Sequence, residues 1–258
     1  MSNTVLTELV GDHVLVVKLN RPEARNAINA ELAQAMERVV EESEADPAVR
    51  AVILTSTTDP VFCAGADLKM VAAGDVNGMY TDKHGFAGFV AAPRTKPWIA
   101  AVAGKALGGG LELCLACDMI VAGTESYFGL PEVRRGIFAA AGGVFRLPQV
   151  IPKHIAMQMV ATGVPIPALR AYELGLVNQL AQTSDVLTTA IDLANEIALG
   201  APFAVRESLG IARKASELTE EALWALSEDL RERIVKTGDF QEGAQAFIER
   251  REPQWSGQ

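Results

Sequence analysis

Short apolar runs alternate with stretches of helical periodicity along the first half of the chain. After the run at 14–19, Asn29 has the features of a helix N-cap, and the apolar side chains that follow it recur at helical spacing. Asp46-Pro47 ends that pattern, and another β-branched run begins at Val49. Apolar strands separated by helices predict a layered α/β arrangement with a buried sheet. We expect strands at VLVVKL (14–19), VRAVILT (49–55), WIAAV (98–102) and MIV (119–121).

Strand signals fade after about residue 150, and the remaining pattern is helical. The segment TEEALWALSEDLRERIVK (219–236) is the clearest amphipathic helix, with one apolar stripe opposite acids and arginines. This change of pattern predicts a helical final third after an α/β body. Such a region either packs on its own core or mediates assembly. The other helices that we expect lie at 154–161, 168–174, 186–199 and 204–214.

Composition and charge narrow the class of protein. The 258 residues are 49% apolar and 21% charged, which excludes bulk disorder, and the net charge is −9. A chain this acidic gains little from a phosphate backbone, so we expect no nucleic-acid partner. The first residues lack the pattern of a cleaved leader, and no apolar run approaches the ~18–20 residues that a membrane span needs. We therefore expect a cytoplasmic protein without a membrane partner.

The three cysteines lie inside apolar runs. Cys114 and Cys117 have C-x-x-C spacing, but the sequence offers no second Cys/His pair nearby to complete a zinc site. The surrounding LELCLACDMIV is typical of a buried helix that runs into a strand. We expect Cys63, Cys114 and Cys117 to be small buried side chains without a metal or redox role.

Two glycine-rich loops are candidates for substrate contact. FCAGADL (62–68) follows a strand, and GKALGGGLE (104–112) leads from the strand at 98–102 into a helical run. A helix N-terminus presents unpaired N–H groups that suit a developing oxyanion, although glycine before a helix more often reflects tight packing. Neither loop matches a phosphate-binding or dinucleotide-binding motif.

Two glutamates are candidates for proton transfer. Glu112 is the only acid in the apolar stretch LELCLA. An unpaired buried carboxylate is costly, so Glu112 either has a structural partner or is held there to move protons. Glu132 follows Pro131 and, taken alone, is typical of a solvated acid in a first helical turn. Together with two backbone donors these acids would form a general acid/base site around an enolate, but spacing does not show that they converge.

Seven stretches of the chain are specific when they are taken together and in order. They are LNRPEARNAI (19–28), FCAGADLKM (62–70), KPWIAAVAGKALGGGLELCLACDMIVA (96–122), FGLPEVRRGI (128–137), AGGVFRLP (141–148), AYELGLVN (171–178) and EGAQAFIERREPQW (242–255). In this order they resemble the crotonase (enoyl-CoA hydratase/isomerase) superfamily over nearly the whole chain. The resemblance implies the ClpP/crotonase-like spiral of repeated ββα units with a C-terminal helical trimerisation region. It implies a spiral body over residues 1–195 and a C-terminal helical oligomerisation region over residues 196–258. It also implies a homotrimer or a dimer of trimers.

The resemblance also implies roles for individual residues. The backbone N–H groups of Ala66 and Gly109 match the family's oxyanion hole, which holds the thioester oxygen of an acyl-CoA substrate. Glu112 matches the glutamate that activates water for addition at Cβ, and Glu132 matches the one that handles the proton at Cα. No metal or cofactor is implied, because coenzyme A is part of the substrate. The residues that match substrate- and CoA-binding positions are Arg25, Ala27, Ala64, Asp67, Leu68, Gly108 and Ala140.

More than one reaction of the superfamily stays open. The presence of both glutamates favours hydration of a 2-enoyl-CoA to a 3-hydroxyacyl-CoA. Stretches such as LPEVRRGI also look like those of carnitinyl-CoA dehydratases, and Δ3,Δ2-enoyl-CoA isomerases can work with the glutamate at 132 alone. Phe138-Ala139-Ala140 stands where hydratases often carry proline-glycine, which leaves substrate preference open. An RNA-binding homologue would need a basic helix, but the helix at 31–44 is rich in acids.

The segment at 71–93 would border the acyl pocket. Its aromatic residues Tyr80, Phe86 and Phe89 either line that pocket or belong to the core. His84 lies among polar residues, so we expect it to be solvated rather than catalytic.

Overall fold

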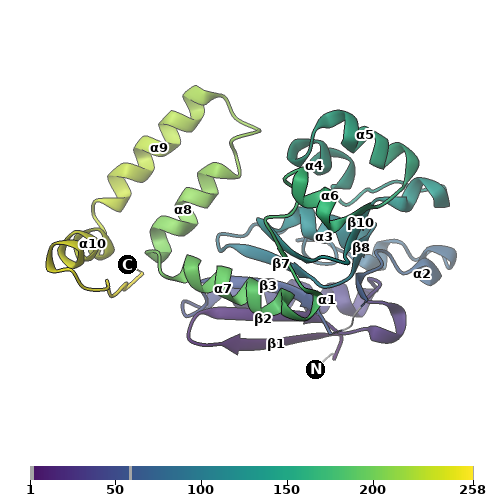
Figure 1. The fold of residues 1–258 in the computed structure, drawn as a ribbon, viewed down its shortest axis with the longest axis horizontal. Coiled ribbons are helices and arrows are strands. Elements are labelled where there is room, and N and C mark those ends of the chain that lie inside the picture. The colour runs from purple at the N-terminus through teal and green to yellow at the C-terminus, as the bar shows by residue number, and fades with distance from the viewer. Residues whose placement is uncertain (1–2, 58–59, 258) are drawn as a thin grey trace.

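The largest sheet of the protein has six strands, and its first strands run along the lower edge of the molecule in Figure 1. The computed structural model describes residues 3–57 and 60–257. Its large sheet contains β1 (Val5–Val10), β2 (Val14–Leu19), β3 (Ala51–Ser56), β7 (Trp98–Val102), β9 (Met119–Gly123) and β12 (Gln179–Ala181). The strands lie in the order β1-β2-β3-β7-β9-β12. Only β1 and β2 pair antiparallel, and the other neighbouring pairs in this sheet are parallel.

Both faces of the large sheet are buried, because successive side chains of each strand enter different apolar clusters. In β7, Trp98 and Ala100 pack on the face that also holds α1 (Ala30–Ala45) and α3 (Gly109–Ala116). Ile99 and Ala101 pack on the opposite face, which α7 (Val186–Ala198) covers. The strands are apolar at successive positions because helices cover both faces of the sheet.

A second sheet places the candidate loops. Its strands are β4 (Val61–Cys63), β8 (Lys105–Leu107), β10 (Tyr127–Gly129) and β11 (Ile166–Pro167), in the order β11-β10-β8-β4. Because β4, β8 and β10 are parallel, their carboxyl ends lie at one edge of this sheet. The residues that follow these ends are Ala64–Leu68, Gly108–Glu112 and Pro131–Glu132. Topology thus gathers three distant segments at one place.

Shorter elements surround the two sheets. The hairpin of β5 (Tyr80–Thr81) and β6 (Gly85–Phe86) lies in the segment that we expected to border the acyl pocket. The remaining helices of the body are η1 (Pro22–Ala24), α2 (Leu68–Ala72), η2 (Asn77–Met79), η3 (Pro131–Arg135), α4 (Gly143–Val150), α5 (Lys153–Thr162), α6 (Ala168–Glu173) and η4 (Thr183–Asp185).

The last helices stand to one side of the body in Figure 1. They are α8 (Pro202–Ala212), α9 (Glu220–Ile234) and α10 (Gly238–Glu249), and we refer to them together as the C-terminal helices. The boundary that we predict between residues 195 and 196 falls near the end of α7, and it stays a prediction. In the described part of the chain, no helix has the length and apolar character needed to cross a bilayer.

The expected α/β body is confirmed in its main elements. The strands at 14–19 and 98–102 have the predicted bounds, and the Asn29 side chain caps α1 by accepting the Leu32 N–H at 2.9 Å. Beyond residue 150, where strand signals fade in the sequence, the structure has the short strands β11 and β12, which pair with β10 and β9. These strands have two and three residues, too few for a recognisable period in the sequence.

Candidate active site

The segment after β4 leaves one backbone donor pointing away from its own neighbours. Ile28 donates to the Gly65 carbonyl at 2.8 Å and accepts the Asp67 N–H at 3.0 Å. These two bonds flank Ala66 in a parallel bridge, so the Ala66 N–H faces the opposite side. Within residues 3–57 and 60–257, the Ala66 N–H donates to no other backbone group.

A second backbone donor lies at the start of α3. The N–H of Gly109 belongs to the first turn of this helix, where no intrahelical acceptor exists. Gly108 before it has φ +57°, a conformation that favours glycine. The two loops touch, since a Cβ added to Gly65 would lie only 2.8 Å from the Gly109 nitrogen. The structure therefore brings the donors at Ala66 and Gly109 into adjoining backbone segments.

Glu112 is buried in the first turn of α3, with only 3% of its surface exposed. Its Oε1 accepts a hydrogen bond from the Gly143 N–H at 2.9 Å. Burial and, to a lesser extent, the nearby Glu132 raise the pKa of Glu112 to about 7, although the N–H groups of Gly143 and Ala141 oppose this rise. The buried carboxylate expected from LELCLA is confirmed, and it exchanges a proton near neutral pH.

Glu132 lies in the first turn of η3, as expected, but the expectation that it is solvated is wrong. Burial raises the pKa of Glu132. Its Oε2 is buried and has no hydrogen-bond partner among the described residues. A Cβ on Gly108 would lie 3.0 Å from Glu132 Oε1, so the glycine leaves room for this carboxylate. An unpartnered buried oxygen is expensive unless it serves a ligand.

Four of the candidate residues lie close together in the structure. Glu132 contacts the Gly108 position next to the Gly109 donor, and its charge acts on Glu112. Glu112 lies one helical turn after Gly109 in α3. Two backbone donors, the buried carboxylate of Glu112 and the partly buried carboxylate of Glu132 thus meet at the ends of β4, β8 and β10.

The chain is similar to a family of known proteins over most of its length. The family model described as enoyl-CoA hydratase/isomerase matches residues 10–258. The chain belongs to the enoyl-CoA hydratase/isomerase family. The crystal structure of enoyl-CoA hydratase from Mycobacterium tuberculosis superposes with a TM-score of 0.94, at 41% identity and with 100% of both chains covered. The predicted crotonase fold is thereby confirmed.

Relatives in this family differ in the activity that their names give. A carnitinyl-CoA dehydratase of Proteus mirabilis is 38% identical over 95% of this chain and 95% of its own length. A mevalonyl-CoA hydratase of Aspergillus fumigatus is 38% identical over 94% of this chain and 91% of its own length. The chain is therefore similar to hydratase- and lyase-type enzymes that act on different acyl groups.

The residues matched to CoA-binding positions surround the Ala66 segment. Arg25 and Asn26 both have φ +54°, and the Ala64 N–H donates to the Arg25 carbonyl at 3.1 Å. Arg25, Ala64 and Leu68 are exposed, and Ala27 is buried. These positions remain candidates.

Asp67 has internal partners that the sequence did not reveal. Its carboxylate pairs with Arg21 at 3.3 Å and accepts the Lys69 N–H at 3.1 Å as the cap of α2. Asp67 therefore fixes the loop that carries Ala66. Ala140 is exposed and precedes the Ala141–Gly143 turn that holds Glu112.

The segment at 71–93 borders the site through two aromatic rings. Phe86 is buried against α3, where a Cβ on Gly109 would lie 2.6 Å from its Cε1. Tyr80 packs edge-on against Phe86 with ring centroids 5.4 Å apart. Burial and the nearby Glu112 raise the pKa of Tyr80, which places this ring beside the carboxylate. Phe89 is fully buried and packs against Trp98, so it belongs to the core.

The expectation that His84 is solvated is wrong. Its side chain is buried, and its Nδ1 lies 3.9 Å from Glu37 Oε2 on α1. This burial results from close packing of the 85–88 turn on α1, since a Cβ on Gly88 would overlap the Ala33 carbonyl oxygen. The non-catalytic role of His84 stays a prediction.

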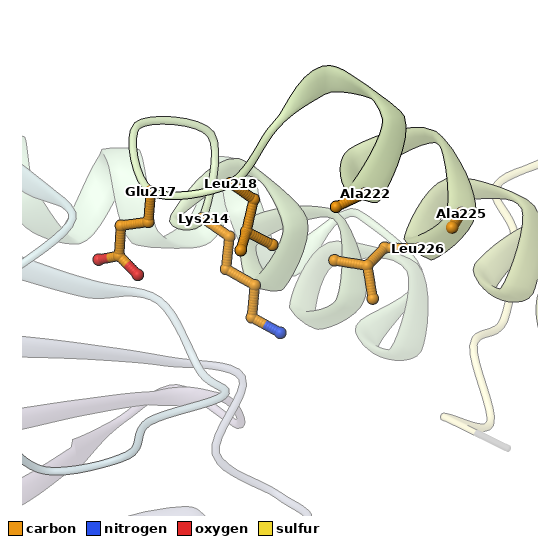
Figure 2. Close-up of a pocket in the computed structure, with 6 residues that line it drawn as sticks. All are labelled: Lys214, Glu217, Leu218, Ala222, Ala225 and Leu226. Carbon is orange, nitrogen blue, oxygen red and sulfur yellow. The ribbon is translucent and has the colours of Figure 1, made fainter.

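The pocket near the C-terminal helices is not part of the candidate active site. A pocket of about 490 Å³ opens between the end of α8 and α9, and Figure 2 shows its lining by Lys214, Glu217, Leu218, Ala222, Ala225 and Leu226. None of these is a candidate site residue. Among the described residues, no group of three His, Cys, Asp or Glu side chains is placed to hold a metal ion. The cysteines are free, with Cys63 and Cys114 buried and Cys117 partly buried.

Proposed function

We propose that this protein is an enoyl-CoA hydratase, which adds water reversibly and syn to a 2-enoyl-CoA thioester to give a 3-hydroxyacyl-CoA. The observation that carries the proposal is the meeting of two carboxylates, one buried and one partly buried, with the backbone donors of Ala66 and Gly109. Membership of the enoyl-CoA hydratase/isomerase family supports an acyl-CoA substrate.

The backbone donors would supply electrophilic activation. Water adds to Cβ of an unsaturated thioester only if the negative charge that develops is taken up by the carbonyl oxygen. The N–H groups of Ala66 and Gly109 are fixed by the Ile28 bridge and by α3, so they need no rearrangement to receive that charge. One such donor contributes about 3–4 kcal/mol to transition-state stabilisation in other acyl-transfer sites.

The glutamates would divide the proton transfers. Glu112, as carboxylate, takes a proton from water while the water oxygen bonds to Cβ. Glu132, in its protonated form, gives a proton to Cα as the enolate collapses. The raised pKa values of Glu112 and Glu132 support both roles, because each carboxyl then exchanges its proton closer to neutral pH than an ordinary glutamate does. Exchange with solvent restores both groups, so the net reaction is addition of one water.

A second candidate is dehydration of a carnitinyl-CoA-type substrate by the same site. The relative named carnitinyl-CoA dehydratase favours it, and the exposed Phe138 at the departure from proline-glycine gives a different side chain for substrate contact. Isomerisation of a Δ3-enoyl-CoA is less well supported, because it leaves the amide-held Glu112 without a function.

We further propose a homotrimer or a dimer of trimers in the cytoplasm, with no metal, cofactor or nucleic-acid partner. The acid-rich face of α1 argues against RNA binding. Filter binding to RNA at physiological salt should give no retention above background. Turnover should survive exhaustive treatment with a chelator.

A panel of thioesters tests the activity directly. We expect loss of the conjugated-enoyl absorbance with crotonyl-CoA or longer 2-enoyl-CoA substrates as water adds. Faster turnover of crotonobetainyl-CoA, or of the dehydrated form of mevalonyl-CoA, would select that relative's chemistry instead. Absence of turnover with every member of the panel would reject the hydratase proposal.

A further inference from the structure

Arg146 lies in the first turn of α4 and folds back over the turn before it. Its Nη2 donates to the Val90 carbonyl at 2.6 Å, and its Nη1 reaches the Ala141 carbonyl at 3.5 Å. Val90 belongs to the segment that carries Tyr80 and Phe86. One guanidinium therefore joins the aromatic side of the site to the Ala141–Gly143 turn.

The backbone of this turn is shaped to admit the guanidinium. Gly142 has φ +111°, a conformation that a side chain would strain. A Cβ there would lie 2.8 Å from Arg146 Nη1 and 3.2 Å from its Cζ. The Arg146 side chain thus covers the Cα of Gly142, between the two residues whose N–H groups face Glu112.

The charge of Arg146 also reaches Glu112. Burial is the largest cause of the raised pKa of Glu112, and the Arg146 charge opposes it. In return, Glu112 opposes the fall that burial causes in the pKa of Arg146. A guanidinium stays protonated in proteins, so this opposing charge is permanent.

We propose that Arg146 is a positioning residue, which holds the Ala141–Gly143 turn against Glu112 and stabilises Glu112 as the carboxylate that receives a proton. The inference rests on the proposed function only for the direction of that proton transfer. Arg146 itself need not touch the substrate.

Arg94 offers a matched control. It donates to the Phe89 and Ala116 carbonyls and stacks over the Phe89 ring at 4.0 Å, so it anchors the residue next to Val90. Burial lowers its pKa as well. However, its charge is not among the groups that shift the pKa of Glu112. Loss of Arg94 therefore imitates the packing defect without the effect on Glu112.

The first test compares pH profiles of kcat/KM for Arg146→Met, Arg146→Lys and Arg94→Met. Arg146→Met should move the acid limb upward by about one pH unit, because Glu112 must be deprotonated to act and has lost an opposing charge. Arg146→Lys should restore the limb but with reduced kcat, since an ammonium lacks the fork that spans both carbonyls. Arg94→Met should leave the limb in place. Equal limbs in all three variants would overturn the proposal.

The second test does not need turnover. The Glu112 carboxyl is followed by ¹³C NMR in protein labelled at glutamate, with Glu112→Gln for assignment. Its titration midpoint should rise in Arg146→Met and stay unchanged in Arg94→Met. An unchanged midpoint in folded Arg146→Met rejects the inference even where the enzyme is active. If the Glu112 midpoint rises in Arg146→Met but the protein is inactive on all enoyl thioesters, the inference about Arg146 stands and the proposed function is rejected. If Arg146→Met does not fold, Arg146→Gln replaces it in both tests.

Discussion

The body and the C-terminal helices bury their side chains to different extents. All five residues of β7 are buried, and α3 buries six of its eight residues. By contrast, α8 buries none, α9 only Leu230, and α10 only Asp239 and Ala246. Trp224 on α9 and Phe247 on α10 are 68% and 85% exposed. The C-terminal helices thus expose large apolar side chains, whereas the elements of the body bury theirs.

This difference indicates which region buries its apolar side chains within the chain and which region leaves them exposed. The body encloses two apolar clusters and provides all four groups that meet at the candidate site. The C-terminal helices leave large apolar side chains in water, which is typical of a surface that another protein covers. We therefore expect changes in the body to affect chemistry and stability, and changes in the C-terminal helices to affect assembly.

The largest effect should come from the two carboxylates of the body. Glu112→Gln and Glu132→Gln should each lower kcat about 10²–10⁴-fold, because each removes one proton transfer, with little change in substrate binding. The control is Glu221→Gln at the exposed start of α9, which should keep wild-type turnover. Wild-type rates for either body variant in a stopped assay of crotonyl-CoA hydration would refute the assignment.

Glu112 should also make stability depend on pH. Its pKa is raised to about 7 in the folded protein, so the folded state holds a proton that the unfolded state releases above pH about 4.5. Stability should therefore fall as the pH rises from about 4.5 to about 7, by about 3 kcal/mol in all. Glu112→Gln removes this loss, so denaturant titrations at pH 8 should show a variant that is inactive yet more stable. Parallel pH curves for wild type and variant would contradict this.

A smaller effect should follow from loosening the junction between the two regions. Arg213, just after α8, holds Asp118 through bonds of 2.7 and 2.8 Å and donates to the Lys96 carbonyl. Arg213→Met leaves this mostly buried carboxylate without its cation and should cost about 2 kcal/mol of unfolding free energy. Arg231→Met removes an exposed pair with Glu228 and should cost nothing measurable. Equal midpoints in urea for the two variants would show that the junction contributes little.

The smallest effect on the single chain should come from the apolar surface of α10. Phe247→Ser with Ile248→Ser should leave turnover per site and the fold of the body close to wild type, because both side chains are exposed. Light scattering should nevertheless show a lower mass than the trimer or hexamer that we propose. The matched control, Leu9→Ser on the edge strand β1, should keep the assembled mass. Unchanged mass in the α10 variant would remove this surface from the proposed interface.

Local patterns explain the parts of the fold that the sequence predicts well. The apolar runs and the Asn29 cap define β2, β7 and α1, because each depends on neighbours within a few residues. The short helix α4 is different, since it begins at Gly143 and contains Pro148, both poor helix formers. It forms because tertiary contacts, including the Gly143 bond to Glu112, outweigh local preference.

The candidate site was predictable in its members but not in its geometry. The apolar surroundings of Glu112 are visible in the sequence, whereas its meeting with Glu132 depends on parallel pairing of Ala106 with Phe128 in β8 and β10. The burial of His84 was not predictable either, because it results from contact with α1, which is distant in the sequence. Arg146 was missed because nothing near it in sequence indicates that its partner is Val90.

The bridge between Ile28 and Ala66 has one more consequence. Three backbone hydrogen bonds join 25–28 to 64–67, so the exposed Arg25 loop and the Ala66 donor move as one mechanical unit. Under the proposed function, a nucleotide held at Arg25 would set the register of the donor at the far end of the same substrate. Affinity for the distant part of the substrate would then be converted into turnover, and thioesters shortened to the pantetheine arm should lose kcat as well as binding.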